Sequence, residues 1–158
     1  MNRSNISKPL WLILLVGALL LEVAALFFQY VLDYGPCILC VQIRAVLLVV
    51  ILLATVALAL PSMARLAAVL LIPCSVTFAW FCYQVLGIER GWFEGSCTFE
   101  PPFPAWIPLH EWFPSVFEAW ELCGYTPEIL FGVTMAETLI LVAVVTLILN
   151  AALIIKSR

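Results

Sequence analysis

Four long apolar runs limit what this chain of 158 residues can fold into. They cover residues 10–32, 45–60, 66–86 and 133–155. A helix needs about 20 residues to cross a hydrocarbon core roughly 30 Å thick, so we extend the short second run back to a span over 39–60. Because 65% of the residues are apolar and 11% are charged, too little polar chain is left for a large soluble catalytic domain. The sequence predicts an all-α integral membrane protein, a bundle of four transmembrane helices in a single domain, residues 1–158.

Basic residues distinguish the two sides of such a bundle. The termini and the turn at 61–65 share one side, and the loops over 33–38 and 87–132 share the other. Only Arg44 and Arg90 lie at or near the loop side. The other basic residues lie on the terminal side: Arg3, Lys8, Arg65, Lys156 and Arg158. By the positive-inside rule, both termini face the cytoplasm, and both loops face the periplasm or its equivalent.

The long loop over 87–132 is rich in proline and tryptophan. This composition suits a segment that lies at the membrane interface rather than one that builds its own core. We expect one or two short interfacial helices between Trp106 and Trp120, interrupted by Pro108 and Pro114.

Neither a nucleic-acid-binding pattern nor a metal-binding pattern is found in the sequence. The formal net charge is −3, and the seven basic residues form no cluster, which argues against a nucleic-acid partner. The single histidine, His110, stands alone in the proline-rich loop, whereas zinc sites need four nitrogen or sulfur ligands at tight spacings. We therefore predict no metal site.

Four of the six cysteines lie in the two loops, where an oxidising compartment would let disulfides persist. Cys37 and Cys40 form a Cys-x-x-Cys pair, and Cys97 and Cys123 lie in the long loop. A Cys-x-x-Cys ring is too small to stabilise the fold much, whereas a pair at a helix N-terminus favours a reactive thiolate. We predict redox chemistry for this pair, with a structural disulfide or a metal site as alternatives. Two further cysteines, Cys74 and Cys82, lie in the third span and are predicted to pack in the core.

Polar residues inside the spans mark the second part of the candidate site. Glu22 and Gln29 share a face of the first span, and Arg44 lies one helical turn beyond Cys40. An arginine at this depth suits the polar head group of a lipid-soluble molecule, although it can also extend to the outer interface. Thiols release two electrons when they form a disulfide, and no haem, flavin or iron–sulfur motif is present. We therefore predict a membrane quinone as the electron acceptor.

The sequence resembles the disulfide bond formation protein B (DsbB) family over essentially the whole chain. Cys97 and Cys123 have a separation similar to that in the family, and Gly132 and Met135 precede the last span. The other matching segments are Leu20 to Gln29 (LLEVAALFFQ), Pro36 to Arg44 (PCILCVQIR) and Phe103 to Leu109 (FPAWIPL). A Cys-x-x-Cys pair followed by arginine four residues later, with a second pair in the later loop, is highly specific.

The resemblance implies a thiol:quinone oxidoreductase of the bacterial inner membrane, which reoxidises a periplasmic thiol oxidase similar to DsbA. Cys97 would be attacked by the partner's thiolate, and Cys123 would be its internal partner. Electrons would then reach Cys37 and Cys40, with a Cys37–Cys123 bridge as a possible transient. Cys40 would face the quinone, either ubiquinone or menaquinone, and Arg44 would bind or polarise it.

Two alternatives stay open at this point. A vitamin K epoxide reductase-like protein is also a four-helix bundle with a Cys-x-x-Cys pair and a quinone, but there the loop cysteines precede that pair, whereas here they follow it. A non-enzymatic membrane scaffold with structural disulfides is the second alternative. Replacement of Cys40 by serine separates the enzyme from the scaffold, because only the enzyme would lose turnover.

Overall fold

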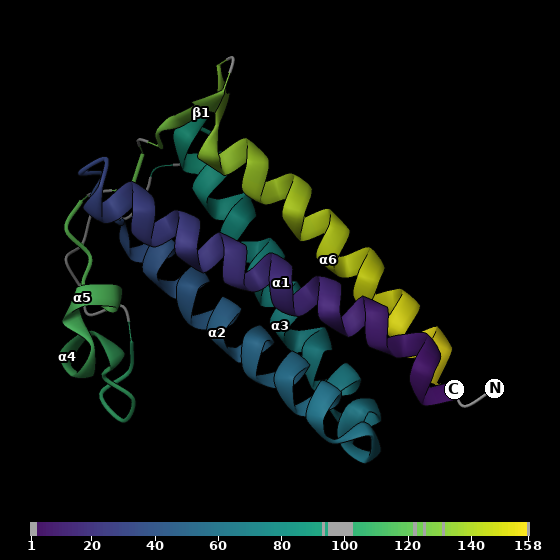
Figure 1. The fold of residues 1–158 in the computed structure, drawn as a ribbon. Coiled ribbons are helices and arrows are strands. Elements are labelled where there is room, and N and C mark those ends of the chain that lie inside the picture. Colours follow the sequence, from purple (N-terminus) through teal and green to yellow (C-terminus); the bar gives the residue numbers. More distant parts are fainter. Residues whose placement is uncertain are drawn as a thin grey trace.

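A computed structural model of the protein describes residues 3–92, 94, 103–121, 123–124, 126–130 and 132–157. Most of these residues belong to four long helices. They are α1 (Arg3–Tyr30), α2 (Ile38–Ala59), α3 (Ala64–Glu89) and α6 (Met135–Ser157), and they run side by side as a bundle (Figure 1). Each contains a stretch long and apolar enough to cross a membrane: Lys8–Tyr30, Ile38–Ala59, Pro61–Glu89 and Met135–Lys156. The predicted four-helix membrane bundle is confirmed.

The bundle has two distinct ends. The start of α1 and the end of α6 lie together at one end, which we call the terminal end (Figure 1). The short 3-10 helix η1 (Pro61–Met63) between α2 and α3 belongs to this end. At the other end, which we call the loop end, α1 stops at Tyr30, α2 starts at Ile38, α3 stops at Glu89 and α6 starts at Met135.

The sequence explains where α6 begins. Thr134 and Glu137 form a reciprocal capping pair: the Thr134 amide donates to Glu137 Oε2 over 3.1 Å, and the Glu137 amide donates to Thr134 Oγ1 over 3.4 Å. This arrangement satisfies amide groups that the first turn of a helix leaves without an intrahelical partner. Farther along the chain, α3 continues through Pro73, as neighbouring helices in a bundle allow.

Small and apolar side chains fill the contact region between the helices. Ala54 in α2 and Ala68 in α3 are almost completely buried, as are Leu71 and Phe78. Small residues at these contacts let helix backbones approach closely, which is how helices associate in lipid. One polar contact crosses the core, where Asn150 Nδ2 donates to Ser75 Oγ over 3.1 Å. Large apolar side chains such as Leu20, Leu52 and Ile148 point outward, as expected for surfaces that face lipid.

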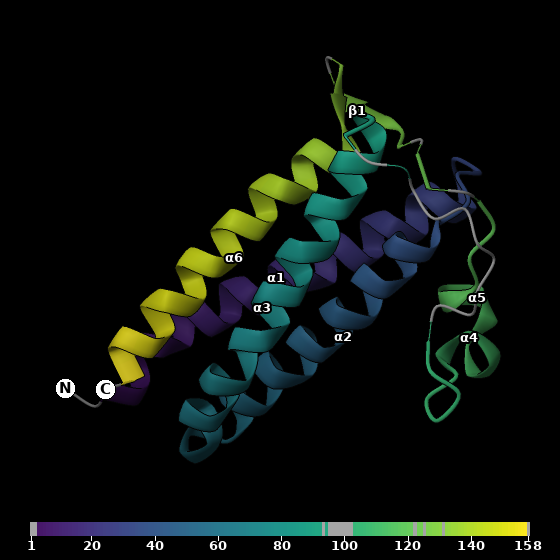
Figure 2. The same cartoon turned by 180° about the vertical axis from the view of Figure 1, so that it is seen from behind.

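The long loop forms two short helices, α4 (Leu109–Trp112) and α5 (Pro114–Phe117). We expected Pro108 and Pro114 to interrupt helical structure in this segment. Pro114 does separate the two helices, because α4 ends at Trp112 and α5 begins at Pro114, and Pro108 is the N-cap of α4. Each proline therefore also starts a helix. This is the position where a missing amide proton costs nothing. Both views of the fold place α4 and α5 beside α1 and α2 at the loop end (Figures 1 and 2).

Two short strands precede α6 and were not predicted. The strands β1 (Glu128–Leu130) and β2 (Val133–Thr134) pair in an antiparallel hairpin at the loop end of α3 and α6 (Figure 2). The turn between them contains Gly132 with φ +79°, a backbone conformation that favours glycine. The hairpin is an addition within the loop region, and the predicted all-α membrane bundle stands. Strands of three and two residues are too short to show an alternating apolar pattern.

Candidate redox site

The Cys-x-x-Cys pair lies at the N-terminus of α2. Cys37 is the N-cap residue, and its Sγ accepts a hydrogen bond from the Cys40 amide over 3.4 Å. The Sγ atoms of Cys37 and Cys40 lie 2.9 Å apart, both as free thiols. Cys37 is buried and Cys40 is half-buried. The first helical turn therefore brings the two sulfurs close enough for their oxidation to a Cys37–Cys40 disulfide.

A third thiol reaches the same helix end from the long loop. The amides of Trp120 and Glu121 donate to Pro36 O over 3.0 and 3.4 Å, so the chain after α5 runs alongside the start of α2. Two residues later, the Cys123 thiol forms a hydrogen bond with the Cys37 side chain, and it also accepts from the amides of Ile38 and Leu39. This approach requires a glycine at position 35, because a Cβ atom there would meet Glu121 Cγ at 2.8 Å.

The surroundings of Cys123 and Cys37 shift their pKa values in opposite directions. The hydrogen bond from Cys37 and the amides of Leu39 and Ile38 lower the pKa of Cys123 to about 6, although burial opposes this change. Hydrogen bonds to Cys123 and to Cys40, together with burial, raise the pKa of Cys37 well above its ordinary value. At neutral pH, Cys123 is therefore a thiolate, the form that attacks a disulfide, and Cys37 keeps its proton.

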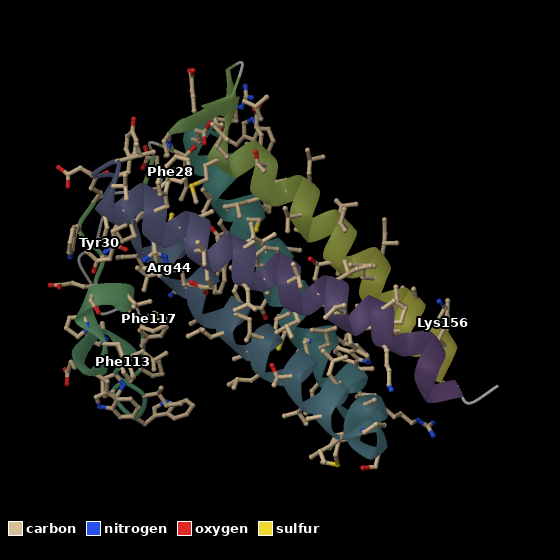
Figure 3. The ribbon with its side chains drawn as sticks, viewed as in Figure 1. Phe28, Tyr30, Arg44, Phe113, Phe117 and Lys156 are labelled. Carbon is tan, nitrogen blue, oxygen red and sulfur yellow. The ribbon has the colours of Figure 1, made fainter. Side chains whose placement is uncertain are left out.

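Arg44 lies one turn farther into α2 and points toward α1 and α5 (Figure 3). Its Nη2 donates to Ala25 O over 3.1 Å. Its Nη1 donates to Gln29 Oε1 over 2.5 Å and to Val116 O over 3.0 Å. Only 4% of the residue is exposed, so Arg44 does not extend to the surface, which was the alternative for this residue. A buried guanidinium keeps its positive charge, and here it is held among oxygen atoms.

A cavity of about 110 Å³ joins the thiols to Arg44. Cys37, Cys40 and Arg44 line one part of it, and most of the remaining wall is apolar. The apolar wall includes Leu21, Ala24 and Phe28 of α1, Ile43 and Leu47 of α2, and Leu139 of α6. A second cavity of about 520 Å³ shares Leu21, Ala24 and Leu47 with the first, and continues between α1 and α6 toward the terminal end. The two cavities suit a flat, mostly apolar molecule that carries a hydrogen-bond acceptor at one end and an apolar tail.

Comparison with known proteins identifies the family. The family model described as "Disulfide bond formation protein DsbB" matches residues 7–153. The chain belongs to the DsbB family. Relatives named "Disulfide bond formation protein B" include one from Shewanella sp. strain MR-4, which is 35% identical over 138 residues, or 85% of this chain and 79% of the relative. Another, from Shewanella loihica, is 33% identical over 144 residues, or 89% of this chain and 84% of the relative.

Membership of the DsbB family makes the chain a membrane-bound disulfide bond formation protein with disulfide oxidoreductase activity. It also favours this family over the vitamin K epoxide reductase-like alternative. Of the four loop cysteines that the sequence singled out, the structure brings Cys37, Cys40 and Cys123 together. The fourth, Cys97, lies outside the described residues. Its pairing with Cys123 stays a prediction.

Four other residues of this DsbB-family chain lie near the site or behind it in the core. Cys82 is fully buried in the core of the bundle, and Cys74 is half-buried in the same helix. Glu22 is 8% exposed, and its Oε1 has no hydrogen-bond partner among the residues that the structure describes. Sequence reasoning noted Gln29 but gave it no role. Its partners are Arg44 and a backbone carbonyl of the long loop, and a backbone carbonyl leaves no signal in a sequence.

Proposed function

We propose that this member of the DsbB family oxidises a reduced thiol oxidase similar to DsbA and passes the two electrons to a membrane quinone. The observation that carries the proposal is that two thiols, Cys37 and Cys40, and the buried Arg44 line one largely apolar cavity, while a third thiol, Cys123, contacts Cys37. Cysteines that only linked loops through structural disulfides would not need a cavity with a guanidinium group in its wall.

The proposed thiol route is a series of exchanges in which one S–S bond forms as another breaks. The partner's thiolate attacks Cys97 in a Cys97–Cys123 disulfide, which releases Cys123 as a thiolate. Cys123 then attacks Cys37 of the Cys37–Cys40 disulfide and releases the Cys40 thiolate. The amides of Ile38 and Leu39, which stabilise a thiolate at Cys123 beside Cys37, favour the attack. A second thiol of the partner resolves its bond to Cys97, so the partner leaves oxidised. The freed Cys97 thiolate attacks Cys123 of the Cys37–Cys123 bond, which restores the Cys97–Cys123 disulfide and leaves Cys37 and Cys40 reduced. Their two electrons and two protons would go to the quinone as the Cys37–Cys40 disulfide forms again.

The cavity residues fit a quinone. A quinone accepts two electrons and two protons and becomes the quinol. Arg44 supplies N–H groups that a quinone carbonyl can accept, and the Cys40 thiol lines the same cavity. The apolar walls from α1 and α6 exclude water from the reacting sulfur. The second cavity, which continues from the first past Leu21 and Ala24, provides an apolar path for an isoprenoid tail. Ubiquinone and menaquinone both meet these requirements.

The proposal includes a location and an orientation. We infer a bacterial inner membrane, with both termini in the cytoplasm and the redox loops in the periplasm. Support comes from the basic residues of the terminal side, such as Lys8, Arg65 and Lys156, and from the position of Cys37 and Cys123 at the loop end. This orientation gives a periplasmic partner access to the thiols, while the quinone arrives through the lipid.

The experiment supplies the purified protein with a reduced DsbA-like protein and a short-chain ubiquinone, and follows oxidation of both partner thiols and reduction of the quinone. We expect one quinone reduced for each partner oxidised, and no turnover without quinone. Cys40→Ser should abolish turnover, and Arg44→Ala should raise the quinone KM about tenfold or more, because a hydrogen bond to a charged group contributes roughly 1.5–3 kcal/mol.

A matched control is Cys74→Ser, which removes a half-buried thiol that lines neither cavity. This variant should turn over like the unmodified protein. Full activity in Cys40→Ser would favour the scaffold alternative. Unchanged quinone kinetics in Arg44→Ala would contradict the role proposed for the arginine.

A further inference from the structure

The loop helix α5 is attached to the bundle through two consecutive carbonyl groups. Ser115 O accepts hydrogen bonds from Gln29 Nε2 over 3.3 Å and from the Tyr30 hydroxyl over 2.5 Å. The next carbonyl, Val116 O, accepts from Arg44 Nη1 over 3.0 Å. Figure 3 shows Tyr30 and Arg44 on the side of α1 and α2 that faces this loop. The attachment therefore joins the long loop to the arginine of the cavity.

Gln29 occupies the centre of this attachment. It is 1% exposed, and both ends of its side-chain amide have partners: Oε1 accepts from Arg44, and Nε2 donates to Ser115 O. Arginine can only donate and a carbonyl can only accept, so these two partners fix the orientation of the amide. A carboxylate could satisfy Arg44 but not Ser115 O, and an amine could satisfy the carbonyl but not the arginine. A neutral amide serves both.

The same attachment sets the position of the loop thiol. After α5, the chain continues to Trp120 and Glu121, whose amides bond to Pro36 O, and then to Cys123 beside Cys37. If α5 moved away, Gln29 and Arg44 would lose carbonyl partners, and such a hydrogen bond contributes about 0.5–1.5 kcal/mol, or roughly 1.5–3 kcal/mol for the charged arginine. The state with α5 in place is therefore also the state in which Arg44 is held at the cavity.

We propose that Gln29 is a positioning residue that couples Arg44 to the loop helix α5, so that quinone binding and the placement of Cys123 beside Cys37 support each other. This inference rests on the proposed function, because it takes the quinone as the ligand of Arg44. Coupling between two sites acts equally in both directions. A bound quinone that holds Arg44 in place stabilises the docked loop, and a docked loop strengthens quinone binding.

Two measurements test the two directions separately. One is the equilibrium binding of a short-chain ubiquinone to the purified, detergent-solubilised protein. The other is the rate at which a maleimide labels Cys123 in the fully reduced, quinone-free protein at about pH 9, where the thiol is largely ionised whether the loop is docked or released. The labelled peptide is identified by mass spectrometry. The second measurement needs neither quinone nor partner. A thermal unfolding curve for each variant verifies that the bundle is folded.

Three variants separate the effects of the two hydrogen bonds that Gln29 makes. Gln29→Leu removes both hydrogen bonds, so it should weaken quinone binding about tenfold and speed Cys123 labelling about tenfold. Gln29→Glu keeps an acceptor for Arg44 but loses the donor to Ser115 O, so quinone binding should stay within about twofold while labelling still accelerates. Tyr30→Phe removes the other bond to Ser115 O without touching Arg44. We expect faster labelling there, with quinone binding again within about twofold.

A matched control is Thr55→Val, which removes a side-chain hydrogen bond to the Ile51 carbonyl within α2, away from the loop. Both measurements should match the unmodified protein in this variant. Gln29→Leu values within twofold of the control would overturn the proposal, and so would a change in labelling alone with quinone binding unaffected. If the unmodified protein bound no quinone, the proposed function would fail, and faster labelling in Gln29→Leu would then support a role of Gln29 limited to the loop.

Discussion

The long loop is attached to the bundle in two different ways at two places. The α5 part is held through buried groups, because Gln29 and Arg44 donate to its carbonyls. Phe117 is 3% exposed and packs edge-on against Phe103 of the same loop. Beside the hairpin, the contacts include one ion pair near the surface, between the end of α3 and the start of α6. Arg90 forms an ion pair with Glu137, in which the side chains are 51% and 30% exposed, and Thr126 donates to Glu89.

The difference indicates which attachment shapes the site. Hydrogen bonds to charged, buried groups contribute roughly 1.5–3 kcal/mol, whereas exposed ion pairs contribute about 0–1 kcal/mol. The strong attachment adjoins the thiols and the cavity, and the weaker one adjoins the start of α6. We expect changes on the α5 side to alter the chemistry of Cys123, and changes on the hairpin side to leave it nearly unaffected.

The largest effect is expected from Phe117→Ala. Loss of a buried phenylalanine costs about 3–5 kcal/mol, and we expect much of that loss to fall on the docking of α5, because Phe117 is the buried residue of this helix, which contacts α2. At about pH 9, where the thiol is largely ionised in either position, the labelling rate of Cys123 in the reduced protein should rise more than about tenfold. Trp112→Ala, which removes a side chain that is 59% exposed on the neighbouring α4, is the control and should change the rate little. Equal rates in Phe117→Ala and the control would show that Phe117 does not anchor the loop.

An effect of intermediate size is expected in the pH dependence of the Cys123 labelling rate. Because its pKa is lowered to about 6, the thiol stays ionised above that pH and gains a proton below it. The labelling rate should be half-maximal near pH 6 and fall about tenfold for each further pH unit, whereas an ordinary cysteine would be half-maximal near 8.5. Phe117→Ala should move the midpoint upward, because the loop thiol leaves the Cys37 thiol and the amides of Leu39 and Ile38, which lower its pKa. A midpoint near 8.5 in the unmodified protein would contradict this placement of the thiol.

The smallest effect is expected from Arg90→Gln. Removal of this exposed ion pair should lower the stability of the protein by less than about 1 kcal/mol. Both the rate and the pH midpoint of Cys123 labelling should stay as they are in the unmodified protein. Differential scanning calorimetry and the same labelling assay measure the two quantities. A shift in the pH midpoint would mean that the hairpin also positions the thiols, and the contrast between the two attachments would then be wrong.

The four-helix bundle could be predicted because each helix is determined by residues that are close together in the sequence. The apolar runs determine the four helices, and the spacing of Cys37, Cys40 and Arg44 places them on the first turns of α2. A helix of known pitch converts such spacings directly into neighbours. The Thr134 and Glu137 capping pair also follows from a local pattern, although only the structure drew attention to it.

The contacts of the long loop were not predictable in the same way. Cys123 meets the amides of Ile38 and Leu39, and Gln29 meets a carbonyl of α5. In these contacts a side chain meets a backbone group that is distant in the sequence. Every residue has a backbone carbonyl, and every residue except proline has a backbone N–H group. No residue pattern therefore identifies them in advance. The requirement for a small residue at Gly35 has the same origin, because it depends on the arrival of Glu121.

The larger cavity has a consequence for how the rate of the reaction depends on concentration. Its wall includes Ile13, Leu20, Leu141 and Val145, which are also exposed on the outer surface of α1 and α6. For the quinone proposed above, entry past these residues is entry from the lipid, so the concentration that counts is the quinone's mole fraction in the bilayer. Dilution with extra lipid would slow the quinone half of the reaction, whereas dilution with extra water would slow only the partner half.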